Sequence, residues 1–197
     1  MLRESIMQRK EFIEQIENNP IIAAIKDDMG LEKCLETDIG VIFVLYGDVC
    51  SIPKIVNRIK EAGKTVVIHV DLINGLSSKE VSLDFIRNYT AADGIITTKP
   101  NLIKHAKELG LNTILRFFML DSIALQNVEK QSHAEVQPDI IEVLPGILLP
   151  EFFEKIRKIS RVRLMASGLI TNKTEVLNAL NNGVISISTT NQSIWNM

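Results

Sequence analysis

The sequence predicts an α/β fold in which eight parallel strands and their helices close into a short (β/α)8 barrel of the TIM type. Short apolar runs alternate with amphipathic helical stretches along all 197 residues. The runs begin about 23 residues apart on average, which suits βαβ units with short connections. No Gly-x-Gly-x-x-Gly motif follows the first run, so an open dinucleotide-binding sheet is less well supported than a closed barrel.

The predicted strands are apolar and rich in β-branched residues, as expected of parallel strands that are covered on both faces. They lie at 21–25, 41–45, 65–70, 94–97, 113–117, 140–144, within 163–170, and at 184–188. Helical patterns lie between them at 52–61, 78–89, 101–109, 122–132, 150–159 and 173–181, each followed by glycine or a polar turn.

The two ends of the chain differ from a regular strand–helix unit. The pattern over residues 2–17 predicts a helix with Ile6, Phe12, Ile13 and Ile16 on one face. Only nine residues follow Ser188, too few for a normal last helix. We therefore expect one domain over 1–197, with a helix in 1–19 and the barrel in 20–197. The N-terminal helix should either replace the missing helix beside the last and first strands or cap the barrel floor.

Composition limits the function classes. The net charge is −2 and the sequence pI is near 6.0, which argues against a strongly basic nucleic-acid binder. Cys34 and Cys50 show no metal-ligand spacing and read as free thiols in a reducing cytoplasm. The first ten residues lack the apolar core of a signal peptide, and no apolar run approaches the roughly 18 residues that a membrane span needs. We expect a cytoplasmic protein with no membrane partner and no metal.

The last two strands end in loops of small and hydroxylated residues. Ser167 and Gly168 follow one strand, and Thr189 follows Ser188 of the next. In (β/α)8 barrels, adjacent loops of this kind form a phosphate-binding cup, because glycine lets the backbone approach and loop N–H groups donate. The alternative is that the Ser-Gly pair merely turns the chain.

Charged side chains gather at or near the carboxyl ends of other strands, which is the functional end of such a barrel. They are Lys26, His69, Asp71, Lys99, Arg116 and Glu142. Together they could hold a small anionic polyol, with cations on the phosphate and the carboxylates and His69 on the hydroxyls. The alternatives are a structural histidine, a buried Arg116–Glu142 ion pair and a solvated loop at Lys26.

Six motifs in order resemble the family of glycerol uptake operon antiterminator regulatory proteins. They are Pro20-Ile-Ile-Ala-Ala-Ile-Lys26, His69-Val-Asp71, Asp93-Gly-Ile-Ile-Thr-Thr-Lys99, Arg116-Phe-Phe-Met-Leu-Asp-Ser122, Pro138-Asp-Ile-Ile-Glu-Val-Leu-Pro-Gly146 and Ala166-Ser-Gly-Leu-Ile170. The resemblance implies a bacterial regulator that senses glycerol 3-phosphate, binds the leader of a glycerol-catabolic mRNA, prevents premature termination and stabilises the message. It implies no enzymatic activity and no cofactor besides the effector, and a homo-oligomer is compatible with it.

The resemblance also implies a ligand site. It would be lined by Lys26, His69, Asp71, Lys99, Arg116, Glu142 and Gly168, to which the cup adds Ser167, Ser188 and Thr189. The family pattern has glycine where this chain has Ser167. That serine can donate to a phosphate or narrow the loop, so it bears on the identity or affinity of the ligand.

The RNA surface and the reaction class stay open at this stage. Candidate phosphate contacts are Lys155, Arg157, Lys158 and Arg161, with a second basic set at Lys54, Arg58, Lys60 and Lys64. Both sets could equally be solvated helix faces. The competing functions are a barrel enzyme of the aldolase or isomerase type, using Lys26 or Lys99 with Glu142 as base, and a ligand-binding protein that acts through a protein partner.

Overall fold

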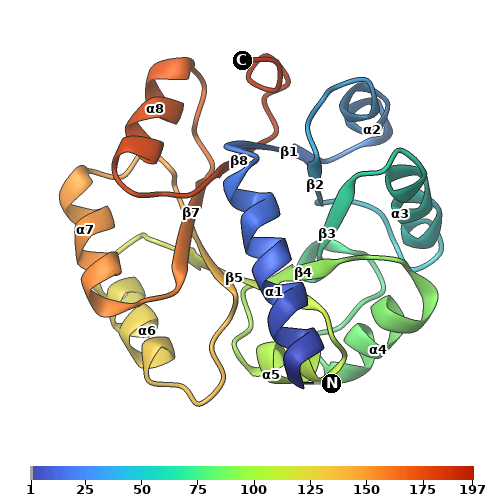
Figure 1. Cartoon of the computed structure of the whole chain (residues 1–197), viewed down its shortest axis with the longest axis horizontal. Helices are drawn as coiled ribbons and strands as arrows, with labels where there is room; N and C mark the ends of the chain where they lie inside the picture. Colours follow the sequence, from blue (N-terminus) through green and yellow to red (C-terminus); the bar gives the residue numbers. More distant parts are fainter. Residues whose placement is uncertain (1) are drawn as a thin grey trace.

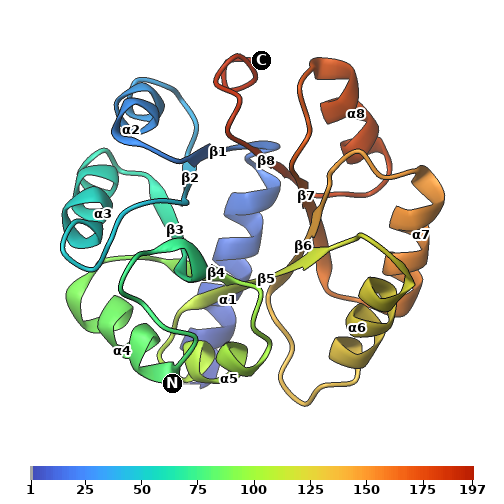
Figure 2. The same ribbon diagram turned by 180° about the vertical axis from the view of Figure 1, so that it is seen from behind.

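Eight parallel strands pair in sequence order and close into a barrel in the computed structural model, which describes residues 2–197 (Figures 1 and 2). The strands are β1 (Ile21–Ile25), β2 (Val41–Val44), β3 (Thr65–His69), β4 (Gly94–Thr97), β5 (Asn112–Phe118), β6 (Ile140–Leu144), β7 (Arg163–Ser167) and β8 (Ile187–Thr189). The predicted (β/α)8 barrel is confirmed. The last strand was expected to begin at residue 184, but β8 pairs with both β7 and β1 only from Ile187 onward.

Helices surround the barrel. They are α2 (Asp28–Leu35), α3 (Ile52–Glu61), α4 (Glu80–Tyr89), α5 (Asn101–Glu108), α6 (Ser122–Ser132), α7 (Pro150–Ile159) and α8 (Lys173–Asn181). The sequence pattern missed α2, which has only eight residues and contains Gly30. Asp27 caps this helix by accepting the Gly30 N–H at 2.7 Å, and that Asp–Gly spacing was the available signal. No helix in the described part of the chain is both long and apolar enough to cross a membrane.

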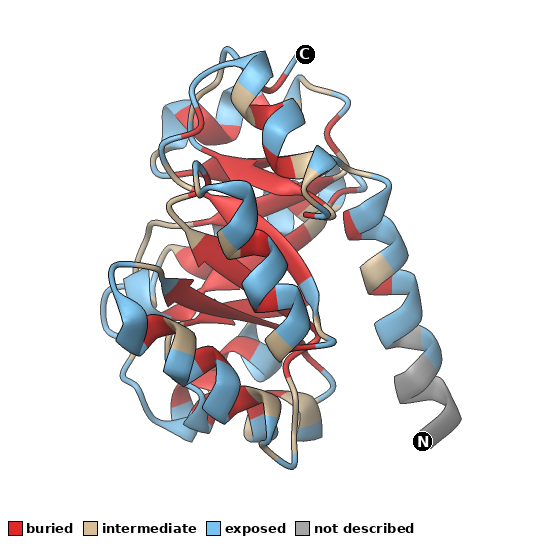
Figure 3. Ribbon diagram, turned by 90° about the vertical axis from the view of Figure 1, so that its left-hand side faces the viewer, coloured by how far each residue is buried: buried red, intermediate tan, exposed pale blue. Residues whose placement is uncertain are grey.

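The N-terminal helix α1 (Leu2–Glu17) crosses the barrel at the amino ends of the strands (Figures 1 and 3). Its Phe12 and Ile16 are buried in one cluster with the strand residues Ile22, Ile114 and Ile140. Of the two expected positions, the helix therefore takes the barrel floor. Ile13 is half-buried, and the side chain of Ile6 lies outside the described residues.

Polar contacts fix α1 to the starts of three strands. They join Arg9 to Asp139 (2.8 Å), Gln15 to Thr65 (2.9 Å) and Glu17 to Arg163 (3.1 Å). Asp139 is almost fully buried and its second oxygen accepts the N–H and hydroxyl of Thr113 at 2.8 Å each. The helix thus closes one end of the barrel and leaves the carboxyl ends of the strands as the accessible end.

The gap left by the missing last helix is filled by the C-terminal turn. Ile194 and Trp195 are buried, and the Trp195 indole Nε1 donates to the Thr189 carbonyl at 2.9 Å. This turn lies between α2 and α8 (Figure 1). It covers the β8–β1 seam and holds the end of β8 from outside.

Replacing Phe12 with alanine should lower the free energy of unfolding by about 3–5 kcal/mol, because the cavity would open in the barrel floor. Chemical denaturation measures this. Lys10→Ala, on the exposed side of α1, is the control and should stay close to wild type because its contact with Glu14 is a surface pair. Equal stability of the two variants would show that α1 is not part of the core.

Candidate functional site

A layer of polar side chains lies inside the barrel near the carboxyl ends of the strands. Arg116 on β5 stands opposite Glu142 on β6, and Ser167 on β7 stands opposite Ser188 on β8. His69 ends β3. All five side chains are buried, and one step toward the floor the same strands carry the apolar residues Val67, Ile114, Ile140 and Met165. The register places Arg116 beside Glu142 and Ser167 beside Ser188, and the hydrogen bond from Ser188 to Glu142 brings the two pairs together.

Glu142 is the centre of this layer. It has no exposed surface, accepts the Arg116 Nε–H at 2.6 Å through one oxygen, and accepts the Ser188 hydroxyl at 2.9 Å through the other. The Arg116–Glu142 ion pair that we considered as an alternative is therefore present. It also orients Arg116, whose terminal guanidinium nitrogens have no hydrogen-bond partner within the described residues.

Arg116 forms part of the wall of two cavities. One cavity, of about 300 Å³, is also lined by Ser167, Gly168, Ser188 and Thr189. This volume lies at the lower end of the range for small-molecule sites. The other cavity, of about 710 Å³, extends from Arg116 toward α6. The loops after β7 and β8 thus meet at the smaller cavity, as expected of a phosphate cup.

The β7–α8 loop has an unusual backbone. Gly168 has φ of 76° and Leu169 has φ of 60°, so two successive residues are left-handed. This conformation is uncommon for leucine and is found preferentially at functional sites. The loop is tied to the neighbouring one because the Gly146 N–H donates to the Gly168 carbonyl at 2.9 Å. Sequence reasoning identified Gly168 but not the strained Leu169 beside it.

His69 is a neutral imidazole in this layer. Burial, assisted by the positive charge of Arg116, lowers the pKa of His69 to about 4. Its Nδ1 is buried and has no hydrogen-bond partner among the described residues. A neutral imidazole offers one donor and one acceptor, so His69 can bind a hydroxyl group without adding charge.

Side-chain alternation along the predicted strand would place Asp71 on the same face as Val67 and His69, but Asp71 lies beyond the end of β3. The strand ends at His69 and the chain turns into a short 3-10 helix, η1 (Val70–Leu72). Asp71 is exposed and accepts three hydrogen bonds, from the Thr97 hydroxyl (2.8 Å) and from the N–H (2.6 Å) and hydroxyl (2.7 Å) of Thr98. Burial opposes ionisation, but these bonds hold the pKa of Asp71 below its ordinary value. Its carboxylate ties the end of β3 to the end of β4.

Lys26 and Lys99 are exposed residues just beyond β1 and β4. Neither lines the cavities that Arg116 adjoins. The structure therefore places both lysines on the rim and does not bring their ammonium groups together with Arg116 and Glu142.

Exposed apolar side chains, which we call the apolar rim, lie at the carboxyl end of β5 and in the segments that follow β5, β6 and β7. Its members are Phe118, Leu120, Ile123, Ile147, Leu149 and Leu169, each about half exposed or more. Sequence reasoning did not identify this rim. The available signal was the apolar run that continues past the end of β5 from Phe117 to Leu120.

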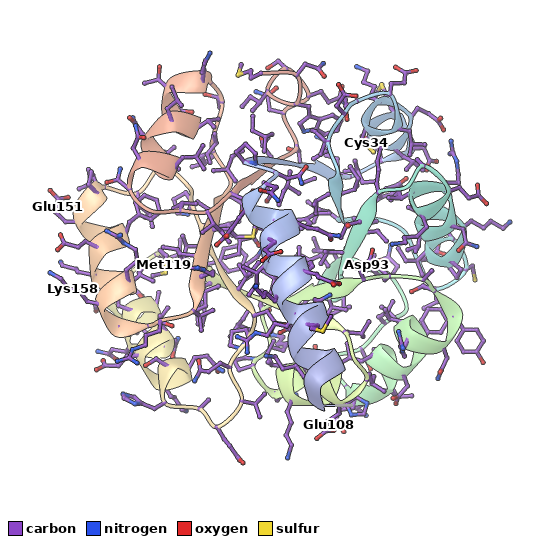
Figure 4. The ribbon with its side chains drawn as sticks, viewed as in Figure 1. Cys34, Asp93, Glu108, Met119, Glu151 and Lys158 are labelled. Atoms are coloured by element: carbon purple, nitrogen blue, oxygen red, sulfur yellow. The ribbon has the colours of Figure 1, made fainter. Side chains whose placement is uncertain are left out.

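The first basic set lies on the outer face of α7 and just after it. Lys158 pairs with Glu154 at 2.7 Å, and Lys155 lies over the ring of Phe152 at 5.1 Å. Arg157 and Arg161 are exposed. Figure 4 shows Lys158 and Glu151 pointing outward at this edge of the molecule. The set is solvent-accessible, but carboxylates are interspersed with it.

The second basic set is not a free surface. Arg58 makes two hydrogen bonds to Glu32, at 2.7 and 2.8 Å, and Lys60 pairs with Asp93 at 2.7 Å. Lys64 is buried and donates to backbone carbonyls at 2.6 and 2.8 Å. Lys60 and Lys64 are therefore engaged in partly buried contacts within the fold, whereas Arg58 forms an exposed ion pair with Glu32.

Comparison with known proteins identifies relatives over nearly the whole chain. The model of the family described as glycerol-3-phosphate responsive antiterminator matches residues 21–195. The protein YgcP of Escherichia coli (strain K12) is 42% identical over 182 residues, which cover 92% of this chain and 94% of that protein.

Two solved structures extend this likeness to three dimensions. One is a glycerol uptake operon antiterminator regulatory protein from Listeria monocytogenes str. 4b F2365, with 35% identity, a TM-score of 0.84 and coverage of 90% of this chain and 95% of the other. The second is a glycerol uptake operon antiterminator-related protein from Thermotoga maritima MSB8, with 33% identity, a TM-score of 0.77 and coverage of 91% and 99%. The chain therefore belongs to the family of glycerol-3-phosphate responsive antiterminators.

Proposed function

We propose that this protein is a cytoplasmic antiterminator that binds glycerol 3-phosphate in the barrel mouth and, in response, binds and stabilises the leader mRNA of a glycerol-catabolic operon. Family membership supports the regulatory role. The observation that carries the ligand assignment is the fixed guanidinium of Arg116 beside a cavity of about 300 Å³. A guanidinium with free terminal N–H groups binds phosphate oxygens in a bidentate manner.

The loops around this cavity supply the remaining ligand contacts. In the proposed complex, the backbone N–H groups that follow β7 and β8 donate to the phosphate, and Gly168 allows its close approach. His69, at the end of β3 and outside the lining of this cavity, is the candidate to bind a hydroxyl of the glycerol moiety from the same polar layer as Arg116. Lys26 and Lys99, exposed on the rim, contribute long-range attraction for the anion.

The enzyme alternative has weaker support. A Schiff-base or acid–base lysine is normally activated by burial, yet Lys26 and Lys99 are both exposed. Glu142 accepts hydrogen bonds from Arg116 and Ser188 and lines neither cavity that Arg116 adjoins, which argues against its acting as a general base on a ligand there. These contacts favour a site that binds its ligand without transforming it.

The proposed RNA surface is the outer face of α7 together with Arg161. Lys155, Arg157, Lys158 and Arg161 are all exposed there, whereas Lys60 and Lys64 of the comparable run around α3 are engaged in partly buried contacts. A homo-oligomer would place two such faces along one RNA and raise avidity.

Arg116→Lys should weaken glycerol 3-phosphate binding about ten- to hundredfold, measured by isothermal titration calorimetry, because lysine keeps the charge opposite Glu142 but loses the guanidinium N–H groups. Arg116→Ala is a poorer test, since it would leave Glu142 charged and buried without its partner, at a cost of about 3–5 kcal/mol. Arg58→Lys, at a surface pair with Glu32, is the matched control. Unchanged affinity in Arg116→Lys would remove this guanidinium from the ligand site.

Replacing Lys155, Arg157 and Lys158 with glutamine should weaken binding of the operon leader RNA and reduce the slope of log affinity against log salt by about 2, the value for three contacts to a single strand. Fluorescence anisotropy over a salt series measures both quantities. The control variant carries Lys54, Arg87 and Lys104 replaced with glutamine, the same charge change spread over α3, α4 and α5. An equal loss in the two variants would mean that only net charge matters and that α7 is not the RNA surface.

A further inference from the structure

Ser167 is a buried residue with an unused hydroxyl group. It is the last residue of β7, is 3% exposed, and lines the cavity of about 300 Å³ beside Arg116. Its Oγ is buried and has no hydrogen-bond partner among the described residues. Burying a hydroxyl group without a partner destabilises a protein, whereas an alanine at the same position would carry no such cost.

Neighbouring buried serines show how this chain normally treats such a group. Ser188, directly opposite on β8, donates to Glu142 at 2.9 Å. Ser186, directly before β8, donates to the Asn19 carbonyl at 2.6 Å. Both hydroxyls are satisfied within the protein. Ser167 and Ser188 line the same cavity, but among the described residues only the Ser188 hydroxyl has a hydrogen-bond partner.

The surroundings of Ser167 decide which ligand atom suits it. Arg116 lines the same cavity, and within the described residues its terminal guanidinium nitrogens have no hydrogen-bond partner. Arg116 and Glu142 form an ion pair, and the Ser188 hydroxyl already donates to Glu142. Among these buried side chains of the described chain, the donors without a partner are therefore the terminal guanidinium N–H groups of Arg116 and the Ser167 hydroxyl. These donors are complementary to an oxyanion. The hydroxyl can donate its hydrogen bond from a different direction than the planar guanidinium does.

We propose that Ser167 donates a hydrogen bond from Oγ to a phosphate oxygen of the ligand and, with Arg116, forms a two-point anion subsite that sets the affinity for phosphorylated ligands. This deepens the proposed function and rests on it for the identity of the ligand, although the subsite itself requires only a phosphate group. Ser167 is thus a specificity-determining residue. Its unpartnered hydroxyl lowers the stability of the free protein and raises the affinity for the phosphorylated ligand.

The test is calorimetric titration of wild type, Ser167→Ala and Ser167→Cys with glycerol 3-phosphate, inorganic phosphate and glycerol, together with thermal melts of each free protein. We expect Ser167→Ala to bind both phosphate-bearing ligands about tenfold more weakly or worse, with a melting temperature equal to or above that of wild type. Ser167→Cys keeps the size of the side chain with a weak donor and should also lose affinity. Ser186→Ala is the control and should lose thermal stability but keep its affinity.

The outcomes separate this inference from the proposed function. Unchanged affinities in both Ser167 variants would overturn the subsite, as would a loss for glycerol 3-phosphate with inorganic phosphate unaffected, because the hydroxyl would then face the glycerol moiety. If wild type binds inorganic phosphate and glycerol 3-phosphate with equal affinity, the assignment of glycerol 3-phosphate as effector fails. The subsite would still be supported if the Ser167 variants bound inorganic phosphate more weakly than wild type. Binding of neither phosphate by wild type would overturn both.

Discussion

The buried ion pair between Arg116 and Glu142 is the interaction on which the barrel mouth depends. A fully buried carboxylate is tolerated only when it is paired and hydrogen-bonded, and here β5 and β8 supply the partners. The pair joins the neighbouring strands β5 and β6, the Ser188 hydrogen bond extends the contact to β8, and Arg116 is held at the edge of a cavity. The low pKa of His69 comes first from its burial and then from the charge of Arg116, which Glu142 opposes. The ion pair thus shapes the geometry of the site.

The floor helix makes this arrangement possible. Because α1 seals the amino ends of the strands with Phe12 and Ile16, the lower interior can be apolar and only the opposite end needs to accommodate polar groups. Asp139, held by Arg9 and the hydroxyl and N–H of Thr113, anchors the start of the strand that carries Glu142. The Gly168–Leu169 loop, with its two left-handed residues, lies at the opposite end of the barrel from α1.

The alternation of apolar runs and helical patterns was sufficient to predict the barrel, since each buried strand must be covered on both faces. The alternation of side chains along a strand places Arg116 and Glu142 on the inward face, as observed. The same alternation fails for Asp71, because β3 ends one residue earlier than predicted and η1 follows it. Helix α2 was too short to show periodicity. Charge patterns also misled: Arg58, Lys60 and Lys64 look like a surface patch in sequence, but their partners Glu32, Asp93 and the carbonyls of residues 37 and 39 are recognisable only once the helices are packed.

In the proposed mechanism, glycerol 3-phosphate bound in the barrel mouth changes the affinity of the outer surface for RNA. By thermodynamic linkage, an effector that favours the RNA-bound form must raise RNA affinity, and RNA must raise effector affinity by the same factor. The most direct measurement is the affinity of the wild-type protein for the operon leader RNA with and without saturating glycerol 3-phosphate, with glycerol as the control. We expect the protein to bind the RNA more tightly with glycerol 3-phosphate than with glycerol or with no ligand. Equal affinity under all three conditions would contradict it.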